Sequence, residues 1–537
     1  MTRRHPGRLV ALCVLLSGCF DDLGTTTSTS AEATSDASQA SGSTVETAGD
    51  TTGAQTQGTT EPETTGAALS CGDGVVSPEL GEACDDGEDN GALCCGERCE
   101  LLHRARTVVA GEQHSCLAMC DGSVRCWGAG ASGALGDGTT NVWGDEDWET
   151  IVDKTPLGFL DDAQQPTAVV QLALGYAFTC ARLASGGVRC WGRNDNGQLG
   201  YPGIGTQKTS PGGDVRIGGP ALELAVGSAH ACALLEGGAV RCWGDGDNGP
   251  TGLGLLGDIG DDEPPDEVPL VPLDQPVVTL TAGAYHTCAA LEDGSARCWG
   301  RGDSGQLGHG MGGAIIGDDE SPLAVPALEF SAPVTRLWGG RTTTCALLAS
   351  DMTYCWGRNE RGELGLGHTN RIGDDESATS TVAEVPLGDV APRSLSLEEF
   401  LHCAVIGDGT GAIRCLGGVD YGGLGTGAID EACYANNFGC LAPHCCFGDD
   451  ADELPLTQGF PLELEFREVS VGRRHACALT TDHELLCWGS RQDGRLAGGP
   501  LPDECSDAAL GPFCARHPDC CLGDDEPLTR ERAALDY

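Results

Sequence analysis

The chain has 537 residues, a formal net charge of −49 at pH 7 and 30 cysteines. So acidic a surface repels nucleic acid phosphates, which argues against a nucleic acid partner. Cysteines this frequent, in a chain of regular repeats, indicate export to an oxidising compartment, since cytosolic thiols stay reduced.

Residues 1–18 read as an export signal. Three arginines lie within the first eight residues, and an apolar run from Leu9 to Leu16 leads to Ser17-Gly18-Cys19. The junction resembles the bacterial lipobox, which is cut before a cysteine that carries diacylglycerol. We therefore expect lipidation of Cys19 and anchoring to the cell envelope, at the outer membrane or cell surface. The alternative is a plain secretory signal with an incidental Cys19. No later stretch is long and apolar enough to span a bilayer, so the expected membrane contact is the lipid alone.

Two further segments precede the main domain. Residues 19–69 are rich in Thr and Ser and too polar to bury a core, which predicts a disordered tether. Residues 70–104 contain CGDGVVSPELGEACDDGEDNGALCCGERC, which resembles the cysteine-rich repeats of myxobacterial surface proteins and predicts a disulfide knot. A zinc site is the alternative. The module has an odd number of cysteines, so we expect Cys120 to complete it and to staple it to the first repeat.

A short hairpin recurs through residues 105–537. Its best copy is CALLEGGAVRCWG, Cys232 to Gly244, in which a turn lies midway between two cysteines. Such a turn sets the cysteines opposite each other on paired strands, at a separation that a disulfide spans. The predicted pairs are Cys116 with Cys126, Cys180 with Cys190, Cys232 with Cys242, Cys288 with Cys298, Cys345 with Cys355, Cys403 with Cys415, and Cys477 with Cys487.

Repeats with a period of roughly 55–60 residues predict a propeller or solenoid, and seven units suit a closed ring. We expect four-stranded blades, with the strands beyond the hairpin supplied by the segment before it. The stretch LTAGAYHTCAALEDGSARCWGRGDSGQLG, Leu280 to Gly308, resembles the regulator of chromosome condensation repeat. That resemblance extends from about Val108 to the C-terminus and implies an all-β, seven-bladed β-propeller. By fold analogy alone it also suggests a guanine-nucleotide exchange factor.

Two aromatic or polar positions recur beside the hairpin cysteines. A tryptophan follows the second cysteine in most copies. We expect it to pack in the interior; the alternative is that the tryptophans form an aromatic platform for a ligand. Histidines recur just before the first cysteine, and we expect them to form buried hydrogen bonds between blades. A metal site is the alternative.

Acidic Gly-Asp-Asp-Glu turns follow several hairpins. Clustered carboxylates offer the oxygen ligands that calcium prefers, so calcium is the one cofactor considered. The alternative is a solvated turn in which each Asp caps nearby amides. The candidate calcium ligands are Asp261, Asp262, Asp318, Asp319, Asp374, Asp375, Asp524 and Asp525.

Two cysteine-rich insertions, Cys433 to Cys446 and Cys505 to Cys521, duplicate one another near the C-terminus. Stapled loops on a rigid scaffold suit recognition, and aromatic side chains favour interfaces. The predicted partner-binding residues are Tyr434, Phe438, Phe447 and Phe513.

The sequence contains no phosphate-binding loop or Ser-His-Asp motif. We therefore expect a monomeric, non-catalytic, lipid-anchored propeller that binds an extracellular or envelope macromolecule. The alternatives are a secreted enzyme inhibitor and a hydrolase or lyase that acts on an extracellular polymer.

Overall fold

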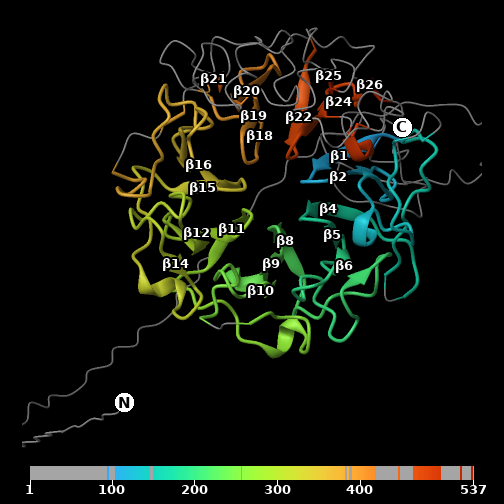
Figure 1. Cartoon of the computed structure of the whole chain (residues 1–537), viewed down its shortest axis with the longest axis horizontal. Helices are drawn as coiled ribbons and strands as arrows, with labels where there is room; N and C mark the ends of the chain where they lie inside the picture. The colour runs from blue at the N-terminus through green and yellow to red at the C-terminus, as the bar shows by residue number, and fades with distance from the viewer. Residues whose placement is uncertain are drawn as a thin grey trace, which may run out of the picture. The chain divides into compact units, whose positions relative to one another are not determined.

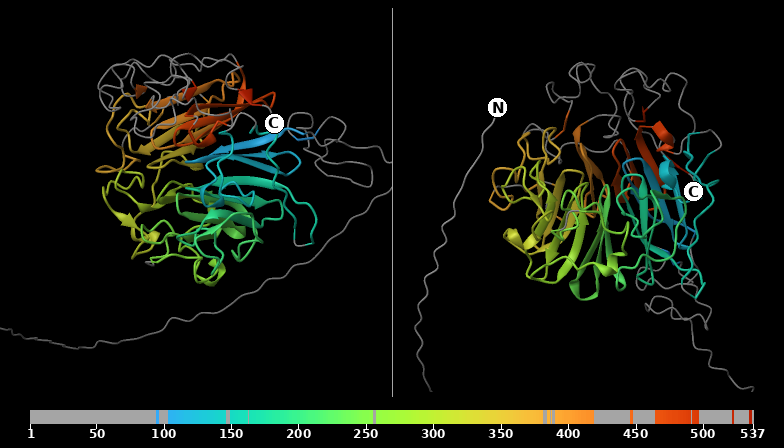
Figure 2. Two further views of the ribbon diagram at one scale, coloured as in Figure 1. Left: turned by 45° about the vertical axis from the view of Figure 1, so that its right-hand side comes forward. Right: turned by 60° about the horizontal axis from the view of Figure 1, so that its bottom comes forward.

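The computed structural model describes residues 94–95, 103–145, 149–161, 163–254, 257–380, 384–385, 387, 390–418, 446–447, 464–490, 492–496, 521–522 and 534–535. These residues form antiparallel sheets that follow one another around a centre (Figures 1 and 2), where residues of all the sheets line a cavity, called the channel below. Seven sheets are present in the described part, which confirms the predicted all-β, seven-bladed propeller. None of the described helices is long and apolar enough to cross a membrane.

The sheets are called blades 1 to 7 in chain order, and each contributes three principal strands. The first strands line the channel: β1 (Ala105–Ala110), β4 (Val169–Leu174), β8 (Ala221–Val226), β11 (Val277–Ala282), β15 (Val334–Gly339), β18 (Ser394–Leu397) and β22 (Phe466–Val471). The second strands are β2 (His114–Met119), β5 (Phe178–Leu183), β9 (His230–Leu235), β12 (His286–Leu291), β16 (Thr343–Leu348), β19 (Leu401–Val405) and β23 (His475–Thr480). The third strands are β3 (Val124–Gly128), β6 (Val188–Arg193), β10 (Val240–Gly244), β13 (Ala296–Arg301), β17 (Thr353–Gly357), β20 (Ile413–Gly418) and β24 (Leu485–Ser490).

The fourth strand of a blade is short and follows the hairpin, so the expectation that both extra strands precede it was wrong. It is β7 (Gln207–Lys208), β14 (Ile315–Ile316), β21 (Cys446–Phe447) or β25 (Cys521–Leu522). In blades 1, 3 and 5 a single bridge residue takes its place: Trp143, Ile259 or Ile372. A last strand, β26 (Ala534–Leu535), pairs with β24. Short 3₁₀ helices occupy the connections: η3 (Ala131–Gly133), η4 (Glu236–Gly238), η5 (Pro265–Glu267), η6 (Pro322–Ala324) and η8 (Gln492–Gly494).

The second and third strands of each blade are joined by a disulfide. In blade 4, for example, Cys288 lies directly opposite Cys298, and their Cα atoms are 4.1 Å apart. Among the described residues all the cysteine pairs predicted for the hairpins are joined in this way. Closing so short a loop stabilises each blade by about 2–3 kcal/mol on the chain-entropy model.

The recurring tryptophan holds neighbouring blades together. Trp191 is fully buried, and its Nε1 donates to the carbonyl of Ala134 in blade 1 at 2.9 Å. The glycine after each tryptophan has a structural reason: Gly300 has a φ of 104°, and a Cβ there would lie 2.4 Å from the carbonyl oxygen of Tyr285. The predicted packing role of the tryptophans is confirmed.

The recurring histidine completes the same junction. His114 Nε2 lies 2.7 Å from Thr179 Oγ1, and that hydroxyl donates to the Ala134 carbonyl that Trp191 also contacts. Because the hydroxyl has only one proton, His114 Nε2 must be the donor to it. The same arrangement recurs with His230 and Thr287 and with His286 and Thr344. The expected buried hydrogen bond between blades is confirmed.

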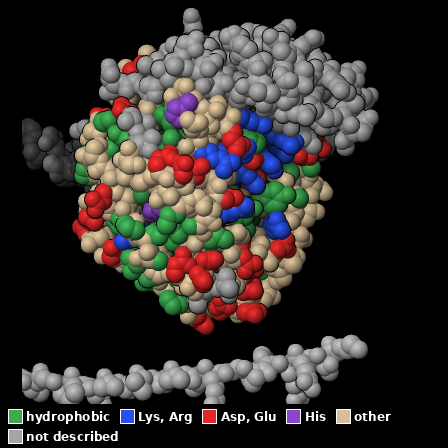
Figure 3. All heavy atoms as spheres, turned by 60° about the vertical axis from the view of Figure 1, so that its left-hand side comes forward, with side chains coloured by type: hydrophobic (Ala, Val, Ile, Leu, Met, Phe, Trp, Pro, Cys, Tyr) green, Lys and Arg blue, Asp and Glu red, His purple; other side chains and the backbone are tan. Residues whose placement is uncertain are grey.

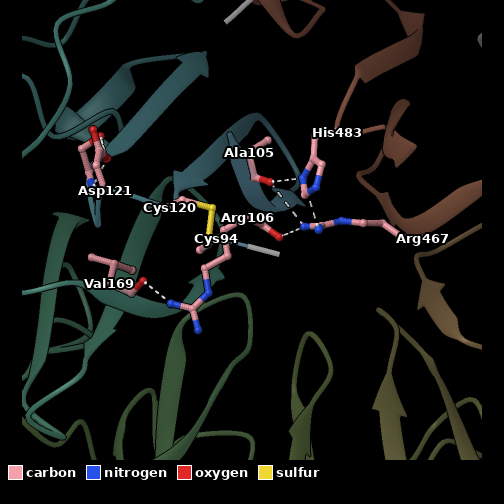
Figure 4. Close-up of a disulfide and its surroundings, with 9 residues drawn as sticks. Cys94, Ala105, Arg106, Cys120, Asp121, Val169, Arg467 and His483 are labelled. Atoms are coloured by element: carbon pink, nitrogen blue, oxygen red, sulfur yellow. Dashed lines mark hydrogen bonds between the residues drawn. A yellow bond between two sulfur atoms is a disulfide. The ribbon is translucent and has the colours of Figure 1, made fainter. Parts of the chain in front are cut away.

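Blade 7 closes the ring against blade 1. Arg467 donates to the carbonyl of Arg106, and His483 Nδ1 lies 3.0 Å from the carbonyl oxygen of Ala105 (Figure 4). Apolar side chains of the two blades form one core, which includes Val108 and Leu479. Beside this closure, Cys94 is bonded to Cys120, the connection to the cysteine-rich module that the sequence predicts. Cys95 is also disulfide-bonded.

Candidate binding face

The propeller has two faces, which are named here by their turns. The first-turn face carries the turns between first and second strands, at residues 111–113, 175–177, 227–229, 283–285, 340–342, 398–400 and 472–474. The second-turn face carries the turns between second and third strands, such as residues 120–123 and 184–187. Residues of all the described blades meet around a cavity of about 190 Å³ where the channel opens on the first-turn face.

Glu112 lines this opening and joins three blades. Its Oε1 accepts a hydrogen bond of 2.6 Å from Ser228 Oγ in blade 3, and its Oε2 accepts one of 2.9 Å from Arg341 Nη1 in blade 5. Glu112 itself belongs to blade 1, so these contacts span the mouth of the channel. The glutamate fixes the position of the Arg341 guanidinium.

A second carboxylate extends this network. Glu399 of blade 6 lies 3.3 Å from Arg358 Nη1, 3.6 Å from Arg341 Nε and 3.5 Å from Arg473 Nε. The contacts with Arg341 and Arg473 are at ion-pair distance, but they are too long for good hydrogen bonds. The neighbouring Glu398 is buried, and burial, together with the charge of Glu112, raises its pKa to about 7. The mouth thus combines fixed arginines with a carboxyl that titrates near neutral pH.

Aromatic residues of the turns are covered by arginines that lie at the ends of the third strands or just after them. Arg193 lies over Tyr176 with 5.4 Å to the ring centroid, and Arg301 lies over Tyr285 at 5.9 Å. Phe400 is covered by Arg361 at 3.9 Å. Cation–π contacts of this kind hold both partners in place. In the view of Figure 3, most of the visible basic side chains gather in one patch, whereas acidic side chains are spread over the visible surface.

The chain enters and leaves the ring on the second-turn face. β1 begins at Ala105, opposite Met119 beside the second turn of blade 1, and Cys120 lies in that turn. β26 pairs with Leu485 and Leu486 beside the second turn of blade 7. The disulfide between Cys94 and Cys120 therefore lies on the face opposite the arginine network.

Both cysteine-rich insertions are rooted on the first-turn face. Gly418 at the end of β20 pairs with Cys446, and Ser490 at the end of β24 pairs with Cys521; both pairs lie beside a first turn. Of the predicted partner-binding residues, Phe447 belongs to β21, and its side chain is not described. Tyr434, Phe438 and Phe513 lie outside the described residues, as does the lipidation candidate Cys19.

The acidic turns begin directly after the fourth strand of their blades. The carboxylates of Asp318, Asp319 and Glu320 lie within 4.8 Å of one another, and those of Asp374, Asp375 and Glu376 do the same. In each turn the first Asp also accepts a hydrogen bond from the next amide, at 2.9 Å for Asp318 and 3.1 Å for Asp374. Asp261 makes the same contact with the amide of Asp262, and Asp524 and Asp525 lie outside the described residues. Calcium binding stays a prediction.

The sequence interpretation missed the arginine and tyrosine residues of the first-turn face. The positions between the turn glycine and the histidine differ in every repeat, as in GEQH, GYAF, GAYH and GRRH. That variation within an otherwise regular repeat is the signal that marks them, because side chains that only maintain the fold repeat from blade to blade. The partners of Glu112 cannot be found without the closed ring, since they lie in different blades.

Comparison with protein families identifies the repeats. The model of the regulator of chromosome condensation (RCC1) repeat matches residues 105–134, 169–198, 223–249, 277–306 and 466–495. The chain is 28% identical over 360 residues to the ultraviolet-B receptor UVR8 of Arabidopsis thaliana, which covers 66% of this chain and 71% of the receptor. It is 34% identical over 209 residues to the human probable E3 ubiquitin-protein ligase HERC3, covering 38% of this chain but only 19% of the ligase.

Solved structures agree with the fold. Yeast RCC1 (Prp20) bound to Kap60 superposes with a TM-score of 0.53 at 19% identity, covering 81% of this chain and 85% of that protein. A second structure of Prp20p from Saccharomyces cerevisiae gives 0.51 at 20% identity, covering 81% and 88%. At this level of identity the likeness shows the propeller fold alone.

Proposed function

This chain is a propeller of RCC1 repeats, and from that premise we propose that it is a non-catalytic binding protein that recognises a macromolecular partner with its first-turn face. One observation carries the proposal. The start of β1, the strand β26 and the disulfide to Cys94 lie on one face, whereas the arginine network and the roots of both insertions lie on the other. A tethered protein with this arrangement leaves its most varied surface free for a partner.

Related propellers support a binding role. The structure of Prp20p is described together with its binding properties to Gsp1p and histones, and yeast RCC1 is described bound to Kap60. HERC3 is named as a probable E3 ubiquitin-protein ligase, but this chain matches only 19% of its length. The ligase activity therefore gives no reason to propose catalysis here. Fold alone does not choose the partner, because one fold carries many functions.

Membrane attachment is part of the proposal. The N-terminal lipobox and the Thr/Ser-rich segment would hold the propeller at the cell envelope by its second-turn face. Replacing Cys19 with Ser is expected to move the protein from the membrane fraction to the soluble fraction. Membrane association that persists in Cys19→Ser would contradict lipid anchoring but would not bear on the proposed binding face.

The binding role is tested by capture from intact cells of the source organism. Two variants of the full chain replace residues 419–445 or 497–520 with short Gly-Ser linkers. We expect the parent chain to retain a defined partner after washing and each trimmed variant to lose it, with an unchanged melting temperature. A partner retained equally by both trimmed chains would place the contact away from the insertions.

A further inference from the structure

A pocket of about 370 Å³ opens on the first-turn face beside the channel mouth, in the size range of small-ligand sites, roughly 300–1,000 Å³. Residues of every blade except blade 6 contribute to it. The lining residues are Glu112, Tyr176, Arg193, Asn196, Ser228, Ala229, Asp245, Tyr285, Arg341 and Arg473.

Two arginines and two tyrosines that line this pocket keep unused hydrogen-bond donors. Arg193 engages Asp195 through Nε at 2.6 Å, and Arg473 approaches Glu399 through Nε at 3.5 Å. In the described part of the chain, the terminal amino groups of both arginines have no hydrogen-bond partner, and neither do the hydroxyls of Tyr176 and Tyr285. Each guanidinium is therefore held at one edge and open at the other.

The carboxylates of the lining, by contrast, already accept hydrogen bonds. Glu112 accepts from Ser228 and Arg341, and Asp245 Oδ1 accepts from the amide of Asp247. A ligand that enters meets open arginine and tyrosine donors beside engaged carboxylates, which favours a ligand that brings acceptors of its own. An arginine with one open edge suits a carboxylate, which accepts two parallel hydrogen bonds from the guanidinium.

The rest of the lining favours a hydroxylated ligand over a peptide. Among the described residues that line the pocket, Ala229 has the one aliphatic side chain, so a peptide would find no recess for the aromatic or aliphatic anchors that dominate protein interfaces. We propose that this pocket binds a carboxylate-bearing sugar unit of an acidic glycan, with Arg193 and Arg473 holding the carboxylate and Tyr176 and Tyr285 donating to ring hydroxyls. The proposal rests on the binding role of the first-turn face and names the ligand class.

Isothermal titration of the purified full chain with trigalacturonate, against its fully methyl-esterified form, tests the proposal. Trigalacturonate is expected to bind and the uncharged ester to bind at least tenfold more weakly. Arg473→Met and Arg193→Met are each expected to weaken binding of the acid at least tenfold, and Tyr285→Phe severalfold. The matched control is Arg216→Met: Arg216 is 61% exposed and lies beside the second turn of blade 2, so this change should leave binding unaltered.

Several results would overturn the proposal: no heat with trigalacturonate, equal binding of the ester, or an affinity unchanged in Arg473→Met. Tighter binding of a poly-glutamate peptide through the same arginines would overturn it in favour of an acidic protein. Melting temperatures of the variants show whether each remains folded. The capture experiment is independent of this test. If trimming the insertions abolishes capture of the partner but trigalacturonate does not compete with it, the glycan proposal is refuted and the proposed binding role stands.

Discussion

Arg341 Nη1 donates to Glu112 Oε2 across the mouth of the channel at 2.9 Å, although 229 residues separate them in the chain. Arg341 also lies near Glu399, and Glu112 raises the pKa of Glu398. The positive charge of Arg341 thus offsets the repulsion among three carboxyl groups that the closed ring brings together, those of Glu112 in blade 1 and of Glu398 and Glu399 in blade 6. Charges that meet across the axis join opposite blades, which nearest-neighbour packing alone does not do.

We expect Arg341→Met to destabilise the propeller more than Glu112→Gln does. Loss of the arginine leaves partly buried carboxylates without their counter-ion, whereas Glu112→Gln keeps an acceptor for Ser228. The expected cost for Arg341→Met is roughly 1–3 kcal/mol at pH 8 and less at pH 5, because Glu398 is protonated there. Urea unfolding at the two pH values measures it. An equal cost at both pH values contradicts the explanation.

The junction between blades predicts which double substitutions are tolerated. In blades 2 and 3 the residues at the histidine and hydroxyl positions are Phe178 and Ala231, which belong to one apolar cluster. His286→Phe with Thr344→Ala copies this pair into blades 4 and 5. The double change should lower the free energy of unfolding less than Thr344→Ala alone, because the single change leaves the ring nitrogen of His286 without its acceptor. Chemical denaturation of both single variants and of the double variant gives the coupling energy. Additive effects would show that the pair does not act as a unit.

Stability should fall in mild acid. Burial lowers the pKa of His114, His286 and His402 to about 4 and that of His230 and His475 to about 3. Each contributes stability that is present above pH 6.5 and is lost as the pH falls towards these values. Glu398 and Glu468, whose pKa burial raises to about 7, act in the opposite sense: their contribution is full below pH 4.5 and is lost as the pH rises through 7.

Between pH 4.5 and 6.5 the five histidines outnumber these two glutamates and Glu320, whose pKa is also raised to about 7, so the free energy of unfolding should decrease with acid by on the order of 3 kcal/mol per pH unit at its steepest. Urea titrations at intervals of half a pH unit measure the slope. The His286→Phe with Thr344→Ala chain is the control, and its slope should be smaller by about one proton. A flat profile over this range would mean that the histidines are accessible to protons in the folded protein.

The acidic turns give a calcium prediction that is tested separately. Burial and the charges of Asp319 and Asp318 raise the pKa of Glu320 to about 7, so ligation by its carboxylate should weaken as the pH falls below 7. Titration calorimetry is expected to detect calcium at pH 8, with weaker binding at pH 6 and in Asp318→Asn with Asp319→Asn. If excess calcium gives neither heat nor a higher melting temperature, the turns are solvated loops capped by their own aspartates.

Much of the fold follows from the sequence because its determinants are local. The two cysteines of a hairpin lie ten residues apart around a turn, and the tryptophan after them repeats with the blade. The register of a strand is less predictable. His402 directly precedes its cysteine, so it occupies the hydroxyl position of blade 6, whereas Thr343 occupies the histidine position of blade 5. The two residue types are thus exchanged between the blades, and Thr343 Oγ1 still lies 3.1 Å from His402 Nε2.

The binding face is predictable only in part. The insertions at Cys433 and Cys505 stand out as additions to the repeat, and the structure roots both on the first-turn face. The pocket of Arg193 and Arg473 does not stand out, because its residues come from blades that meet only when the ring closes. Sequence spacing reports neighbours within a blade and says little about residues across the channel.

The central claim, that the first-turn face binds the partner, is tested most directly by photo-crosslinking in intact cells. p-Benzoylphenylalanine replaces Tyr285 on the first-turn face in one chain and Ser185 in the second turn of blade 2 in another. Irradiation is expected to give one discrete crosslinked product from the Tyr285 position and none from the Ser185 position. A product from the Ser185 position alone would contradict the claim and place the partner on the second-turn face.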